Sequence, residues 1–275
     1  MREFVSQIII RGSFMGEQGI NKRNERLNEI RYNNKKELMK IIEYNNANDI
    51  VVEFQDKYKA KKRCAYKEFK LGKVKNPYDK EVLNVGYLGE GKYSHKEHPH
   101  IWKVWHYMIR RCYDAYHINK YLAYKDVYVC DEWHCFQNFA KWFEDNYYEC
   151  NNEHMHLDKD ILIKGNKIYS PNTCIFVPER INYLFLKSNR ARGLYPIGVS
   201  YHKKAECYTS RCSILNKEGK KNEKHLGTFD NEIDAFLTYK QFKENYIKQV
   251  ADEYKDLIPE KLYDAMYNYK VEIND

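Results

Sequence analysis

Polar and hydrophobic residues alternate most regularly in the middle of the chain, from His154 to Asp160. Side chains two positions apart share one face of an extended strand, so the polar members of this stretch would point the same way. They are His154, His156, Asp158 and Asp160. A Gly165–Asn166 turn, a returning strand and a helix beginning near Pro178 would follow, since proline suits the first turn of a helix. Asn182 lies one turn into that helix, and the pattern predicts a site for one divalent ion between two strands and a helix.

The pattern elsewhere predicts an α+β, multidomain chain. β-rich runs at residues 38–44 and 49–54 are joined by a polar turn, which indicates a small β module. Hydrophobic residues recur at helical spacing over residues 100–114 and 131–147, which predicts two helices that support the hairpin. From residue 197, three short strands precede a helix, which predicts a three-stranded antiparallel sheet packed on that helix. The predicted segments are a charged N-terminal arm (1–35), the β module (36–94), the hairpin with its helices (95–187), the sheet with its helix (195–250) and a helical tail (251–275).

Alternation also sorts the middle strand of the C-terminal sheet, from Glu206 to Ile214. Its even-numbered positions from 208 onward would pack on the helix, and its odd-numbered positions would face outward. The first set is Tyr208, Ser210, Cys212 and Ile214, and the second is Thr209, Arg211 and Ser213. The helix would begin with Asp230 as its N-cap.

This C-terminal region resembles the Apetala-two/ERF DNA-binding domain. The residues that carry the resemblance are Gly198–Val199, the strand Tyr208–Cys212, Leu226–Asp230, and the helix residues Ala235 and Tyr239. In that family the outer face of the sheet lies in the major groove of double-stranded DNA, where arginine can donate two hydrogen bonds to guanine. The resemblance implies DNA contacts from Ser200, His202, Thr209, Arg211, Ser213 and His225. Arg190 and Arg192, in the basic linker before the sheet, would follow the phosphate backbone.

The central hairpin, with the run from Thr173 to Asn182, resembles the HNH nuclease family and its ββα-metal motif. The resemblance implies that Asp158 and Asn182 bind a divalent ion, Mg²⁺ or Mn²⁺, and Asp160 would be a further ligand. Lys159 stands where the family has its general-base histidine and could stabilise negative charge on the phosphate. His156 shares the face of Asp158 and is the predicted general base.

The composition of the chain limits its possible binding partners and its cellular compartment. A net charge of +8 permits binding to a polyanion. Eight cysteines without a CxxC pair indicate free thiols in a reducing cytoplasm, that of a host cell if the chain is phage-encoded. Ile8–Ile10 is too short an apolar run for a membrane span, so no membrane partner is expected. Four cysteines at irregular spacing favour packed thiols over a structural zinc site: Cys130, Cys135, Cys150 and Cys174.

Two functions remain open at this point. The first is a metal-dependent DNA endonuclease that carries a separate DNA-binding module. The second is a DNA- or partner-binding protein, a regulator or inhibitor, that keeps the HNH scaffold without its chemistry. Lys159 at the base position favours the second function, and no pattern indicates an oligomeric state.

Overall fold

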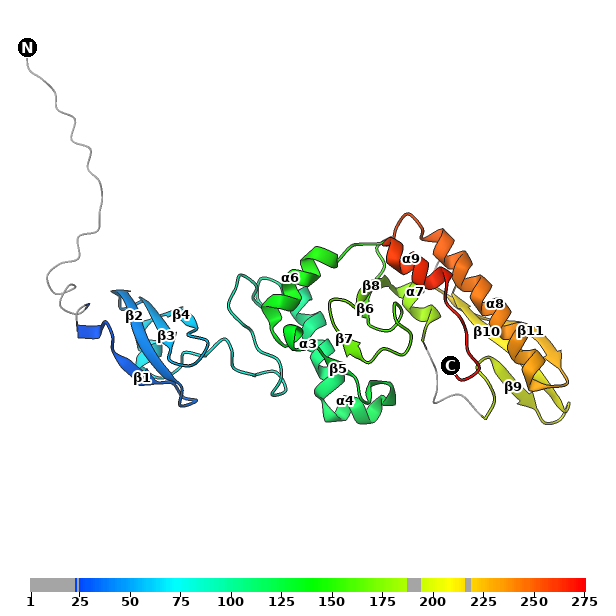
Figure 1. Cartoon of the computed structure of the whole chain (residues 1–275), viewed down its shortest axis with the longest axis horizontal. Helices are drawn as coiled ribbons and strands as arrows, with labels where there is room; N and C mark the ends of the chain where they lie inside the picture. Colours follow the sequence, from blue (N-terminus) through cyan, green and yellow to red (C-terminus); the bar gives the residue numbers. More distant parts are fainter. Residues whose placement is uncertain (1–22, 24, 187–193, 216–218) are drawn as a thin grey trace, which may run out of the picture. The chain divides into compact units, whose positions relative to one another are not determined.

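The computed structural model describes residue 23 and residues 25–186, 194–215 and 219–275. It combines helices with several sheets, one of them a C-terminal three-stranded antiparallel sheet, which confirms the predicted α+β class (Figure 1). The chain divides into two compact units, Met1–Tyr93 and Ser94–Asp275. The predicted hairpin segment and the predicted sheet segment therefore belong to one unit. No helix in the described ranges is long and apolar enough to cross a membrane.

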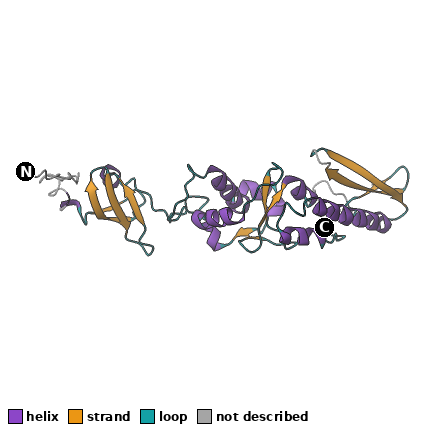
Figure 2. Ribbon diagram, turned by 90° about the horizontal axis from the view of Figure 1, so that it is seen from above, coloured by secondary structure: helices purple, strands orange, loops and turns teal. Residues whose placement is uncertain are grey.

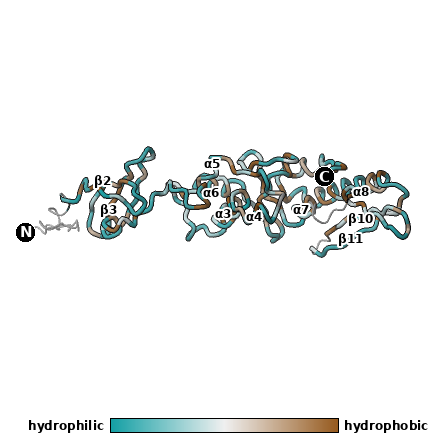
Figure 3. Tube along the Cα trace, turned by 90° about the horizontal axis from the view of Figure 1, so that it is seen from below, coloured by the Kyte–Doolittle hydropathy of each residue, from teal (hydrophilic) through white to brown (hydrophobic). Residues whose placement is uncertain are grey.

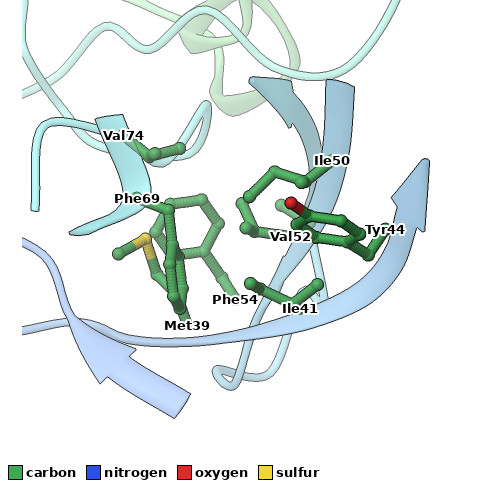
Figure 4. Packing of buried hydrophobic residues seen from close by; sticks show 9 residues of the cluster. Met39, Ile41, Tyr44, Ile50, Val52, Phe54, Phe69 and Val74 are labelled. Atoms are coloured by element: carbon green, nitrogen blue, oxygen red, sulfur yellow. The ribbon is translucent and has the colours of Figure 1, made fainter. Parts of the chain in front are cut away.

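The N-terminal unit is built on a four-stranded antiparallel sheet in the order β1-β2-β3-β4, followed by α2. The elements are β1 (Ile30–Tyr32), β2 (Leu38–Asn46), β3 (Asp49–Phe54), β4 (Lys61–Cys64) and α2 (Tyr66–Lys70). Met39 and Ile41 alternate into the core, and a register shift after Ile41 turns Tyr44 inward in place of Glu43 (Figure 4). The sheet thereby keeps one apolar face beneath Phe69 of α2.

The predicted N-terminal arm is too long. Its Ile30–Tyr32 segment forms the edge strand β1 and pairs with β2 from Ile30 opposite Lys40 to Tyr32 opposite Leu38. All three β1 residues are exposed, so backbone hydrogen bonds to β2 hold the strand in place. Because neither face of β1 is buried, its sequence does not alternate between hydrophobic and polar residues, and no strand was predicted there.

Helices form one side of the second unit: α3 (Pro99–Tyr113), α4 (Ala115–Lys120), the 3₁₀ turn η1 (Leu122–Tyr124), α5 (Asp131–His134) and α6 (Phe136–Asn146). Trp105 of α3 is fully buried and donates its indole N–H to the Trp133 carbonyl at 2.7 Å. The predicted helix over residues 131–147 is interrupted at Cys135, whose backbone is extended (φ −82, ψ 121). The two apolar stripes still meet in an aromatic core, as the helical spacing predicts.

The predicted returning strand is present directly before the helix, but it begins nine residues beyond the Gly165–Asn166 turn. β6 (Met155–Asp158) is antiparallel to β8 (Ile175–Pro178), with Asp158 opposite Ile175, and α7 (Glu179–Leu184) follows directly. The residues just after the Gly165–Asn166 turn form β7 (Ile168–Tyr169), which instead pairs in parallel with β5 (Tyr128–Val129). The ββα unit therefore closes across a long loop that the helical side of the molecule holds in place.

The C-terminal sheet has the order β11-β10-β9, and α8 packs on one face of it (Figure 2). The elements are β9 (Val199–His202), β10 (Cys207–Leu215), β11 (Lys221–Phe229), α8 (Glu232–Glu253) and α9 (Glu260–Tyr267). Gly198 has φ +79, and a Cβ there would lie 2.0 Å from the Tyr239 ring, so only glycine lets α8 approach β9 this closely. The N-cap of α8 is Asn231, which accepts from the Asp234 N–H at 2.9 Å, one residue later than predicted.

Candidate functional site

A cavity of about 410 Å³ lies beside the ββα unit. Its walls come from the end of α3, η1, β6 and the loop that follows it, α7, and Tyr269 near the C-terminus. Every residue predicted for the metal site or for catalysis lines it: His156, Asp158, Lys159, Asp160 and Asn182. The structure thus brings together groups that are up to 26 positions apart in the sequence.

Asp158 ends β6 through its own side chain. Its Oδ1 accepts the backbone N–H groups of Asp160 at 2.9 Å and Ile161 at 2.7 Å, a local turn that competes with the extended strand. Asp160 therefore leaves the strand. Of the four side chains predicted on one strand face, only His156 and Asp158 belong to β6, because His154 precedes the strand and Asp160 follows it. Burial, and then the charge of Asp160, raise the pKa of Asp158 to about 6.

The Asp158–Asn182 pair suits a hard divalent cation. Within the described ranges, Asp158 Oδ2 and the Asn182 amide have no hydrogen-bond partner, so two oxygen ligands face no competing donor. Mg²⁺ is commonly bound through one or two carboxylates, with waters and substrate phosphates completing its octahedron. A metal ion would also favour the ionised form of Asp158, which burial and then the charge of Asp160 disfavour.

No three His, Cys, Asp or Glu side chains in the described part of the chain are grouped so as to hold a metal ion. The candidate site consequently relies on one carboxylate and one amide, with Asp160 available only in part. One oxygen of Asp160 is already paired with the Lys159 ammonium at 3.0 Å.

His156 is half-buried on β6, and its Nε2 lies 3.2 Å from Nδ1 of His154. Burial, followed by the neighbouring His154, lowers the pKa of His156, so the ring is neutral at pH 7. If Nε2 donates to His154, the Nδ1 lone pair of His156 is free to accept a proton. The site therefore contains a neutral imidazole suited to general-base chemistry.

Lys159 is only 7% exposed and acts as a clamp on the loop after β6. Its ammonium donates to Asp160 Oδ2 and to the Asn166 carbonyl, both at 3.0 Å. Asn166 in turn donates to the carbonyls of Lys159 at 2.6 Å and Ile168 at 2.7 Å. The ammonium lines the cavity, but its donors are engaged in holding the loop, which favours a structural role for this lysine.

Arg111, on the last turn of α3, also lines the cavity and was not predicted as a site residue. Its guanidinium interacts electrostatically with the Tyr169 phenol, and its guanidinium carbon lies 5.8 Å from the centroid of the Tyr124 ring. The available signal was its spacing, since Arg111 is three residues after the buried Met108 and next to the buried Cys112. That spacing places an arginine at the margin of the buried face, but what it meets there depends on a loop distant in sequence.

The outer face of the C-terminal sheet is a second polar surface. Four predicted DNA contacts are exposed and one is half-exposed; the exposed residues are Ser200, His202, Arg211 and His225, and the half-exposed residue is Ser213. Arg211 lies opposite His225 in the register and is paired with Glu223 at 3.4 Å. β11 is exposed from Lys221 to His225, and its trace is hydrophilic there (Figure 3).

Thr209 departs from its prediction as an exposed outer-face residue. It is 7% exposed, and its hydroxyl lies 2.8 Å from that of Ser200 on the paired strand. It therefore supports Ser200 and is not itself accessible to a ligand. Arg190 and Arg192 lie outside the described residues.

A buried polar network joins α7 to α8. Glu153 accepts from the backbone N–H of Arg180 at 3.0 Å and from the Tyr254 hydroxyl. The Arg180 guanidinium donates to Glu253 at 2.7 Å, with side chains 11% and 23% exposed. The helix that carries Asn182 is thus fixed to the helix that supports the C-terminal sheet.

Comparison of the chain with family models, with curated proteins and with solved structures gives no match.

Proposed function

We propose that this protein is a metal-dependent DNA endonuclease of the HNH type, with the cavity beside β6 as its active site. The observation that supports this proposal is the lining of that one cavity by a strand carboxylate (Asp158), a helix amide (Asn182) and a neutral imidazole (His156). These are a cation-binding pair and a proton acceptor, the groups that hydrolysis of a phosphodiester requires.

Asp158 and Asn182 would hold a Mg²⁺ or Mn²⁺ ion, which would contact the scissile phosphate and stabilise the leaving 3′-oxygen. His156 would accept the proton of the attacking water, and its contact with His154 would fix the tautomer that leaves a lone pair available. Lys159 would keep the loop closed around the cavity and neutralise part of the charge of Asp160.

The exposed face of the C-terminal sheet would bind double-stranded DNA through Arg211 and its neighbours on β9 and β11. Because this sheet packs on α8, and α8 is joined to α7 through Arg180 and Glu253, the duplex would be held at a fixed distance from the cavity. We place this activity in the cytoplasm, where the eight thiols would stay reduced.

The test is cleavage of supercoiled plasmid by the purified full chain with Mg²⁺ or Mn²⁺. We expect nicking that falls by about 100-fold or more in both Asp158→Asn and Asn182→Ala, since each removes a group that supports the ion at the transition state. The matched control is Asp131→Asn, a carboxylate on α5 whose side chain is fully exposed. Equal cutting by wild type and Asp158→Asn would exclude the proposed site.

One observation favours the alternative, a DNA- or partner-binding protein that lacks catalysis. Lys159 stands where the HNH family has its general base, and its ammonium is occupied by Asp160 and Asn166. In the plasmid experiment, retardation of DNA without nicking under either metal would support this binder and reject the nuclease.

A further inference from the structure

Among the residues that the structure describes, Arg111 is a half-buried cation that lacks the acidic partner found for several other cations of this unit. Lys159 pairs with Asp160, Arg180 with Glu253, and the adjacent Arg110 with Asp114. In the ranges that the structure describes, no carboxylate lies within ion-pair distance of Arg111. The groups that face it are the phenols of Tyr124 and Tyr169 and the Cys112 thiol.

A guanidinium withdrawn from water is costly unless an anion or a set of hydrogen-bond acceptors compensates its charge. The phenol of Tyr169, which is itself only 2% exposed, faces the guanidinium on one side. The Tyr124 ring adds a second contact, so Arg111 is restrained on two sides while the cavity stays open beside it. A planar guanidinium held in this way presents its remaining N–H donors as a fork, which matches the oxygens of a phosphate group.

We propose that Arg111 is a phosphate-binding residue of the cavity and contacts a non-bridging oxygen of the phosphodiester that enters it. This inference rests on the proposed function, because it names the residue that would hold the anionic substrate against the Asp158–Asn182 pair. It explains why a cavity with two carboxylates, Asp158 and Asp160, can accept a negatively charged ligand. The exposed Lys167 at the same cavity adds positive charge where the ligand would enter.

The first experiment measures binding of inorganic phosphate to the metal-free full chain by isothermal titration calorimetry. We expect the affinity to fall by about 10- to 100-fold in Arg111→Gln, as for loss of charge-assisted hydrogen bonds, and less in Arg111→Lys, which keeps the charge but not the fork. The matched control is Arg110→Gln, because Arg110 precedes Arg111 on the same helix, pairs with Asp114 and does not line the cavity. It should bind phosphate within about twofold of wild type.

Folding of the variants is checked independently by tryptophan fluorescence, since all four tryptophans belong to the Ser94–Asp275 unit. If Arg111→Gln does not fold, Arg111→Lys carries the test. Phosphate binding by Arg111→Gln equal to that of wild type, or no phosphate binding by wild type, would overturn the proposal.

The second experiment separates this inference from the proposed function. In plasmid cleavage, Arg111→Gln should raise KM and lower kcat, while Arg110→Gln should change neither. If wild type cuts no DNA but binds phosphate through Arg111, the nuclease proposal fails and the anion site stands. If wild type cuts DNA and Arg111→Gln cuts it with unchanged kcat and KM, the anion site fails and the nuclease proposal stands.

Discussion

The cavity beside β6 and the outer face of the C-terminal sheet are both polar, yet they are built in opposite ways. The cavity collects groups from five separate segments, and burial shifts the pKa of Asp158 upward and that of His156 downward. The sheet face comes from three neighbouring strands, stays in solvent, and pairs its own groups, as Arg211 does with Glu223. A desolvated and fixed site suits chemistry, whereas an exposed, self-paired surface suits the exchange of one partner for another.

The largest difference should appear in the ion pairs that support each region. Arg180→Gln removes the partner of Glu253 in a contact whose side chains are 11% and 23% exposed. We expect the free energy of unfolding of this unit to fall by about 1–3 kcal/mol, because Glu253 loses a charged partner in a largely desolvated contact. Glu223→Gln breaks the exposed pair of the sheet and should change the same free energy by less than about 0.5 kcal/mol.

Urea unfolding followed by tryptophan fluorescence measures both variants, and it reports only on the unit that carries the cavity and the sheet. Equal destabilisation by the two substitutions would mean that the α7–α8 connection is no more fixed than the sheet surface. The distinction between a rigid site and an adaptable surface would then be lost.

The second prediction concerns pH. The pKa of Asp158 is raised from 3.8 to about 6 in the folded chain, so the fold binds a proton more readily than the unfolded chain between these values. Stability of the metal-free protein should therefore decrease as pH rises from about 4 to 6, and Asp158→Asn should be more stable than wild type at pH 7. Asparagine keeps an oxygen for the N–H groups of Asp160 and Ile161, so the turn survives.

The gain expected from Asp158→Asn is on the order of 1–2 kcal/mol at pH 7, since solvent screens part of the charge on a half-buried carboxylate. It should disappear at pH 4, where the wild-type carboxyl is protonated. Metal binding by wild type should weaken in the same range, as pH falls below about 6, because the ligand must be ionised. A variant less stable than wild type at pH 7 would contradict the assignment of Asp158 as an electrostatically strained ligand.

The sequence predicted the cavity better than it predicted the backbone around it. His156 and Asp158 were found from period-two alternation, which depends only on local geometry. The strand that returns to β6 directly before the helix was expected, but the wide loop between the two strands was not. Gly165–Asn166 has the composition of a hairpin turn, whereas the Asn166 side chain ties Lys159 to Ile168 within that loop. The true partner of β6 lies beyond β7, which pairs in parallel with a strand from the helical side.

Arg111 and Thr209 show the other limit of sequence reasoning. Arg111 is a basic residue at a helix end, and its place at the cavity depends on Tyr124 and Tyr169, which come from later segments. Thr209 has the outward parity that alternation gives it, but its hydroxyl is satisfied by Ser200 on the paired strand. Both outcomes depend on contacts between segments that are distant in the sequence, and the spacing of residues along the chain does not predict such contacts.

The smallest effect is expected at the sheet face, where Arg211→Ala tests whether this surface binds DNA. Removing one arginine contact should weaken duplex binding by about 1 kcal/mol, roughly fivefold, because the remaining contacts persist. Thr209→Ser is the matched control, since it keeps the buried hydroxyl beside Ser200 and should leave affinity unchanged. Fluorescence anisotropy with a labelled duplex, in the absence of metal so that no cutting occurs, gives both affinities.

Glu223→Gln sharpens the measurement, because releasing Arg211 from its 3.4 Å ion pair should strengthen binding while Arg211→Ala weakens it. If all three variants bind as wild type does, the duplex is held elsewhere, and the outer sheet face is only a solvated surface.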